Sequence, residues 1–117
     1  MTQKGAYQLI VNLLKTGGES LNLADVLAGS STISGAVVNV TTAGSRVQLP
    51  DIDCREVTVI AKRTNTGSIY VGGVNVSSSI YGAELRPRDS ITLSLSNANM
   101  IYIDAAVNGE GISYVAI

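Results

Sequence analysis

The sequence predicts an all-β fold, an antiparallel β-sandwich of the jelly-roll type, with an N-terminal arm or extra strands before it. Turn residues recur along most of the chain, at the spacing of roughly eight to twelve residues that is typical of sandwiches. The chain has no Phe and no Trp, so Val, Ile, Leu and five Tyr must fill the core, and this residue set favours strands. Twelve glycines, with many Ser, Thr and Asn, supply the turns.

Residues 1–35 differ in pattern from the rest. The segment from Tyr7 to Leu14 fits an alternating strand and also a helical stripe through Ile10, and we favour the strand. A single helical turn follows, capped by Asn22 and containing Leu23. We therefore assign 1–35 to an arm that docks or oligomerises and 36–117 to the sandwich. The candidate partner contacts in the arm are Tyr7, Ile10, Leu14 and Leu23.

Strand patterns begin at Ala36 and continue through the first half of the sandwich. Residues 36–41 alternate, and a short strand at 46–49 ends at Pro50, which lacks a backbone N–H group. In the next strand Val57, Val59 and Ala61 share one face. Residues 64–67 form a turn containing Asn and Gly, which accept positive φ.

The second half contains a short strand at 69–71, a Ser- and Gly-rich loop at 74–84, a turn at 86–89, and three further strands. Together with the strand after Arg55, these apolar runs read as one face of the sandwich. Residues 91–96 show the cleanest period-two alternation in the chain. Five residues are expected in the core, each contributing about 1.5–3 kcal/mol before entropy is subtracted: Ile91, Leu93, Leu95, Ile101 and Ile103.

The residue inventory argues against catalysis and metal binding. The chain has no His and one Cys, which excludes a nucleophile–histidine pair, an intrachain disulfide and a typical zinc site. Asp51 and Asp53 should raise the pKa of Cys54, which we expect to be a small buried side chain at a strand start. The two aspartates lack a calcium-loop pattern and fit a solvated turn. We expect no enzyme, no metal and no cofactor.

Three groups of polar or aromatic residues leave alternatives open. Asp104 lies inside the run I-Y-I-D-A-A, which predicts either an edge strand or a hydrogen-bonding partner. The small basic clusters, Lys62-Arg63 and Arg86 with Arg88, fit solvated turns or pairing with acidic residues of a neighbouring subunit. Of the tyrosines, Tyr70 and Tyr102 are expected in the core, and Tyr81 is the candidate for exposure in a sugar-stacking platform.

Charge and hydropathy limit the classes of partner. The net charge is −1 and 15% of residues are charged, so the basic footprint of a nucleic-acid-binding protein is missing and self-association is tolerated. The apolar run 9–14 is too short to cross a bilayer and lacks the features of a signal peptide. We expect no nucleic acid, no membrane, and synthesis and folding in a cytoplasm.

Five sequence segments after residue 36 match, in order, the pattern of a known domain family: V-T-T-A-G-S-R-V-Q-L-P, C-R-E-V-T-V-I-A-K, N-T-G-S-I-Y-V-G-G, L-R-P-R-D-S-I-T-L and I-Y-I-D-A-A-V-N-G-E-G-I-S-Y. This part of the chain resembles a small β-domain common among virion structural proteins of tailed bacteriophages. The usual pattern has Pro-Gly before a Ser-hydrophobic strand, whereas this sequence has Pro87-Arg88-Asp89-Ser90.

The resemblance implies a capsid decoration or auxiliary protein that binds the shell and stabilises it. Its partners would be the major capsid protein or other virion proteins, and its location the virion, assembled in the host bacterial cytoplasm. Many such proteins are homo-oligomers, often trimers. The alternative is a tail or head-fibre adsorption module that binds a host surface glycan. Within the sandwich, the candidate partner contacts are Tyr81, Arg86 and Arg88.

Overall fold

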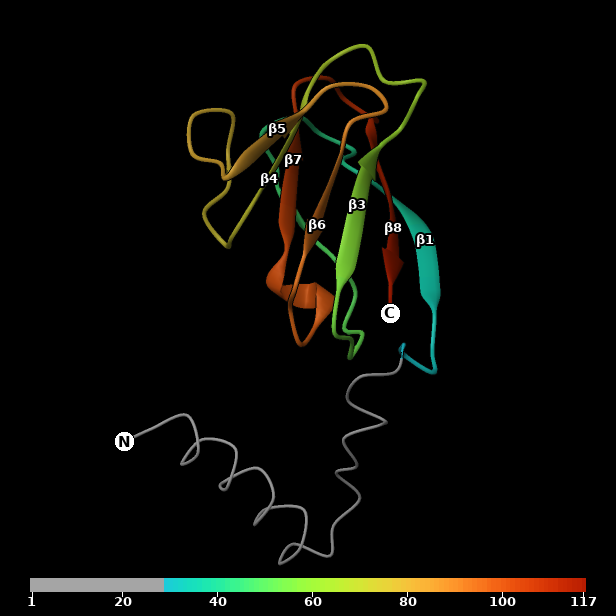
Figure 1. The fold of residues 1–117 in the computed structure, drawn as a ribbon. Coiled ribbons are helices and arrows are strands. Elements are labelled where there is room, and N and C mark those ends of the chain that lie inside the picture. Colours follow the sequence, from blue (N-terminus) through green and yellow to red (C-terminus); the bar gives the residue numbers. More distant parts are fainter. Residues whose placement is uncertain (1–28) are drawn as a thin grey trace, which may run out of the picture. The chain divides into compact units, whose positions relative to one another are not determined.

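The structure, a computed structural model, describes residues 29–117, and a compact unit extends from Ser31 to Ile117 (Figure 1). The strand and helical turn predicted before residue 29, and the contacts proposed there, lie outside the described residues: Tyr7, Ile10, Leu14 and Leu23. The first strand begins at Ser34, two residues before the predicted start of the sandwich at Ala36.

Eight strands and one 3-10 turn make up the described unit. Their bounds are β1 Ser34–Asn39, β2 Val47–Gln48, β3 Val57–Ala61, β4 Ile69–Gly72, β5 Ala83–Leu85, β6 Ser90–Leu93, η1 Ala98–Met100, β7 Tyr102–Ala105 and β8 Gly111–Ala116. One sheet has the order β1-β8-β3-β6 and the other β2-β7-β4-β5, and all pairs are antiparallel. The predicted all-β sandwich is confirmed.

The strand order is that of a jelly roll. The first strand pairs with the last, β2 with β7, β3 with β6 and β4 with β5, so the pairs are nested along the chain. Two further pairs, β3 with β8 and β4 with β7, complete the four-stranded sheets. Eight strands wound in this way form the double-sheet jelly roll.

Side-chain alternation places the core between the sheets. Val57, Val59 and Ala61 are buried while Thr58 and Ile60 are not, as the period-two pattern predicts. In β8 the buried face consists of Ile112, Tyr114 and Ala116. Tyr114 is only 4% exposed and is the core tyrosine, whereas Tyr70 and Tyr102, which were expected there, are half-buried.

Two predictions about the second half of the chain are wrong. The apolar runs do not form one face, because β3, β6 and β8 lie in one sheet and β4 and β7 in the other. The segment expected to be a loop up to Glu84 ends in strand β5, which pairs with β4. This strand has three residues, and Glu84 stands at its centre, so it is too short to show an alternating pattern.

The expected core residues divide into two groups. Ile101 and Ile103 are fully buried, as predicted. Ile91, Leu93 and Leu95 are only half-buried, which corrects the prediction drawn from the cleanest alternation in the chain. Ile91 and Leu93 lie in β6, which ends its sheet, and Leu95 follows that strand. β5, which ends the other sheet, has only three residues and is too short to cover them.

Two polar side chains hold together the turns at one end of the sandwich. Asn65, 6% exposed, donates from its amide to the Gly111 carbonyl at 2.8 Å and accepts from the Gly111 N–H at 3.3 Å. The Glu110 carboxylate accepts from the N–H groups of Thr66 and Gly67 and from the Thr66 hydroxyl. Desolvation opposes its ionisation, but these bonds and the Lys62 charge outweigh it, so the pKa of Glu110 lies below its ordinary value.

Candidate functional site

The acidic residues singled out in the sequence are engaged in structural bonds. The amide of Asn97 donates to Asp51 at 2.7 Å and to Asp53 at 3.2 Å, so one amide group joins the two carboxylates. Within residues 29–117, no group of three or more potential metal ligands is found. Asp104 is buried and accepts from the Gly44 N–H at 2.9 Å, so it has the predicted partner.

The cysteine is held in a bond to the backbone. Cys54 is half-buried, and its thiol donates to the Leu95 carbonyl at 3.2 Å. Burial, followed by the neighbouring Asp53 carboxylate, raises the pKa of the Cys54 thiol despite a backbone bond from Glu56. The direction agrees with the sequence argument and favours the unreactive thiol.

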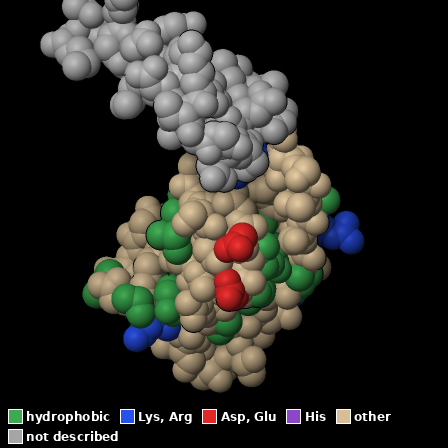
Figure 2. Space-filling view, turned by 90° about the horizontal axis from the view of Figure 1, so that it is seen from below, with side chains coloured by type: hydrophobic (Ala, Val, Ile, Leu, Met, Phe, Trp, Pro, Cys, Tyr) green, Lys and Arg blue, Asp and Glu red, His purple; other side chains and the backbone are tan. Residues whose placement is uncertain are grey.

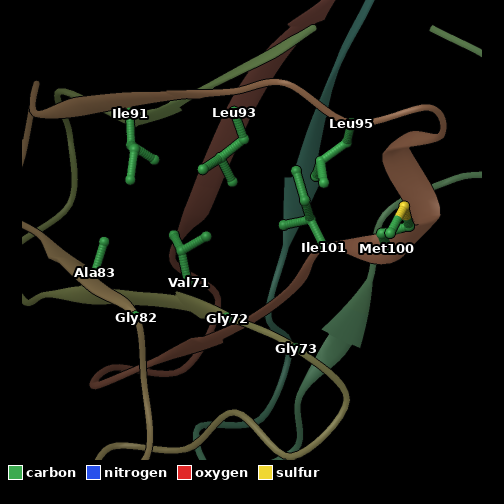
Figure 3. A pocket seen from close by; sticks show the side chains of 10 residues that line it. All are labelled: Val71, Gly72, Gly73, Gly82, Ala83, Ile91, Leu93, Leu95, Met100 and Ile101. Atoms are coloured by element: carbon green, nitrogen blue, oxygen red, sulfur yellow. The ribbon is translucent and has the colours of Figure 1, made fainter. Parts of the chain in front are cut away.

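An apolar groove lies between β6 and the pair β4–β5. Its volume is about 300 Å³, and no charged residue lines it. Figure 3 shows Ile91, Leu93 and Leu95 in a row on one wall, facing Val71 and Ala83 on the other. The lining is Val71, Gly72, Gly73, Gly82, Ala83, Ile91, Leu93, Leu95, Met100 and Ile101. We call this the β6 groove.

The groove lies beside an open strand edge. Ala61 donates its N–H to the Asp89 carbonyl at 2.8 Å, so the backbone groups of Asp89, Ile91 and Leu93 face β3. Those of Ser90 and Thr92 then face outward, where no described strand pairs with β6. An extended segment added at this edge would gain main-chain hydrogen bonds and place alternate side chains in the groove.

A second exposed group lies on the loop between β4 and β5. Tyr81 is 44% exposed, and its ring centroid is 5.1 Å from that of Tyr70 at an interplanar angle of 41°. Its hydroxyl lies 3.5 Å from the Glu84 carboxylate, which also accepts from Ser68 at 2.6 Å. The exposure expected for Tyr81 is therefore present, together with an adjacent hydrogen-bonding acid.

A third feature, the basic hollow, lies on the outer face of the sheet β1-β8-β3-β6. Its volume is about 440 Å³, with Lys62, Arg63 and Arg88 around a floor that includes Ile60. Arg88 is the third residue of a turn closed by a bond from Asp89 N–H to the Arg86 carbonyl, and its φ is 74°. That position in a type II turn favours glycine. It is the position at which this sequence has Arg88 in place of the glycine of the Pro-Gly pattern.

The proposed contacts of the sandwich do not form one site. Arg88 lines the basic hollow, Arg86 is exposed beside it in sequence, and Tyr81 belongs to the β4–β5 loop. Sequence reasoning did not identify the groove, including Met100, which is 52% exposed. Figure 2 shows a face on which hydrophobic side chains lie among backbone and uncharged side chains, with few charged side chains.

Comparisons with family models, with curated proteins and with solved structures find no match for this chain. Within residues 29–117, no helix is both long enough and apolar enough to span a membrane.

Proposed function

We propose that this chain is a structural protein of a tailed-bacteriophage virion, a decoration or auxiliary protein that binds the capsid shell and stabilises it. The observation that carries the proposal is the β6 groove next to an open strand edge. Apolar surface combined with unpaired backbone groups suits an extended apolar segment of a neighbouring protein. The shell protein would supply that segment.

The resemblance of residues 36–117 to phage virion domains supports the same function. Jelly rolls serve in viral capsids and also in lectins, so the fold is compatible with a shell protein but does not single it out. The low charge of the chain keeps electrostatic repulsion between packed copies small.

The proposal is tested with the full-length protein and capsid shells assembled without it. Met100→Glu places a carboxylate at the groove, where a bound apolar segment would desolvate it. We expect at least a roughly tenfold loss of affinity in co-sedimentation, equivalent to about 1.4 kcal/mol. The control is Val74→Glu, because Val74 is 63% exposed and does not line the groove. Failure of the wild-type protein to bind shells would contradict the function, and equal binding of both variants would contradict the groove as its contact.

The second candidate is an adsorption module that binds a host surface glycan. It is favoured by the exposed Tyr81 ring, which contacts Tyr70 in a tilted arrangement, with the Glu84 carboxylate beside it. Aromatic faces pack on sugar C–H surfaces, and an adjacent carboxylate accepts hydrogen bonds from sugar hydroxyls. Tyr81→Ala should abolish adsorption to host cells, whereas Ile80→Ala in the same loop should not. Unchanged adsorption with Tyr81→Ala would exclude this site.

A further inference from the structure

The outer edge of β1 is open. β1 ends its sheet, and no strand among residues 29–117 pairs with that edge. Val40, directly after β1, donates its N–H to the Glu110 carbonyl at 2.8 Å. Because backbone direction alternates along a strand, Val38 and Ala36 also face β8, and Gly35, Val37 and Asn39 present their N–H and C=O groups to the open side.

β1 lacks the features that usually prevent a second strand from pairing with an edge strand. Its sequence, S-G-A-V-V-N, contains no charge and no proline. Its register with β8 is continuous over all six residues, so no bulge twists the edge away. Val37 is 57% exposed on the outer face. Ala36 is also exposed, although it pairs with the buried Tyr114, because β2 has only two residues with which to cover this end of the sandwich.

We propose that β1 pairs antiparallel with β1 of a second copy of this chain, about a two-fold axis through Val37. In this register Val37 lies opposite Val37 of the second copy, and Gly35 lies opposite Asn39. All the outward-facing residues then stand in hydrogen-bonded pairs, which gives roughly six backbone bonds. Registers centred on Ala36 or Val38 bring fewer of these residues into pairs. The two β1-β8-β3-β6 sheets become one continuous sheet.

Charge and shape favour a second copy as the occupant. β1 carries no charged side chain, so the two-fold axis brings no like charges into opposition across the pair. The two Val37 side chains cover each other on the outer face. Asn39, whose amide oxygen accepts from Lys62 at 2.8 Å, lies opposite a glycine, which leaves room for both side chains. The contact is isologous and therefore closes at two copies.

The contact is small. A strand pair of this length buries less than the roughly 1,200–2,000 Å² of a standard interface, so we expect a dimer that dissociates on dilution. A head-to-tail contact between β1 and β6 would instead propagate into a filament. The two arrangements are distinguished by whether Val37 meets its own counterpart.

Disulfide trapping tests the register in the full-length chain. Cys54→Ser removes the native thiol and retains a donor for the Leu95 carbonyl. In that background Val37→Cys should form a disulfide-linked dimer under mild oxidation, because hydrogen-bonded antiparallel partners have Cα atoms about 5.5 Å apart, within disulfide range. The control is Val115→Cys, on the same outer face but on β8, which should give at least tenfold less dimer. Equal trapping of both variants, or none with Val37→Cys, overturns the proposal.

Sedimentation of the uncrosslinked protein provides a second readout. The wild-type chain should show a concentration-dependent dimer, which Val37→Lys abolishes because two ammonium groups would face each other. Val115→Lys should leave the dimer unchanged, and circular dichroism checks the fold of both variants. A monomer at all concentrations, or a dimer retained by Val37→Lys, contradicts the pairing. The pairing is also contradicted if another segment of the same chain occupies the edge of β1. These experiments use no phage particle, so their outcome is independent of the proposed shell function.

Discussion

Asn65 is a buried polar residue whose removal should destabilise the sandwich strongly. Its side chain bonds both backbone groups of Gly111, which is itself buried. In Asn65→Ala the Gly111 carbonyl keeps a bond from the Lys62 N–H at 3.1 Å, but the Gly111 N–H loses its side-chain partner inside the protein. An unsatisfied buried group costs about 1–3 kcal/mol, and the second lost bond adds about 1 kcal/mol. We therefore expect a loss of about 2–4 kcal/mol.

Urea denaturation of the full-length chain measures this loss as a lower midpoint at an unchanged slope. The matched control is Asn108→Ala. Asn108 also bonds a backbone group across turns, accepting from the Ala43 N–H at 2.7 Å, but it is exposed, so water replaces the lost bond. We expect the control to cost less than about 1 kcal/mol. If the two variants are equally stable, the bond of Asn65 to a buried glycine does not lock the turns and this reasoning fails.

Three further predictions concern individual residues. Arg88→Gly should raise the free energy of unfolding by about 1 kcal/mol. The left-handed φ of Arg88 costs roughly 1–2 kcal/mol, which glycine avoids, but glycine also gives the unfolded chain more entropy, and this offsets part of the gain. A lower melting temperature in the variant would contradict this. Gly35→Ala should destabilise the fold, because the added Cβ would lie 2.9 Å from the Tyr114 carbonyl oxygen; wild-type unfolding in urea would refute the clash. Glu110 has a lowered pKa in the fold, so its contribution is complete above its unfolded value of about 4.5 and is lost as pH falls through the folded value. Stability measured against pH should therefore fall less steeply in Glu110→Gln than in the wild type below about pH 4.5. Identical slopes would argue against stabilisation by the bonds of the Glu110 carboxylate to Thr66 and Gly67.

The elements that could be predicted are those whose pattern is set within one strand. Buried and half-buried positions alternate in β3 as the sequence indicates. Asp104 has a hydrogen-bonding partner, one of the two alternatives that its place in an apolar run predicted. The sequence of the turn at 86–89 was also informative, because Arg88, at the position where the Pro-Gly pattern has glycine, has a left-handed φ of 74°.

The features that escaped prediction depend on neighbouring strands. β6 alternates cleanly, yet Leu93 is half-buried because β5 is only three residues long. No pattern within residues 90–96 records the length of a strand elsewhere, so the groove could not be inferred from it. The same holds for β1, where the exposure of Ala36 follows from the brevity of β2. Strand order decides which edges stay open.

The tyrosines show the same limit. Of the tyrosines among residues 29–117, three lie in strands, and composition alone does not say which one faces the other sheet. Tyr114 is buried because it lies on the inward face of β8, with Ile112 and Ala116. Tyr70 alternates with the buried Ile69 and Val71 of β4, so it lies on the other face of its strand. Tyr70 is half-buried, and its ring contacts that of Tyr81.

If the proposed function holds, a tailed phage encodes this chain, and the most direct test is the position of the chain in an electron cryomicroscopy reconstruction of that phage's particle. The proposal predicts density for the eight-stranded jelly roll on the outer surface of the head, with a strand of the shell protein against β6 and in the β6 groove. Density for the jelly roll confined to the tail, or a particle that lacks the protein, would contradict a role in binding and stabilising the shell.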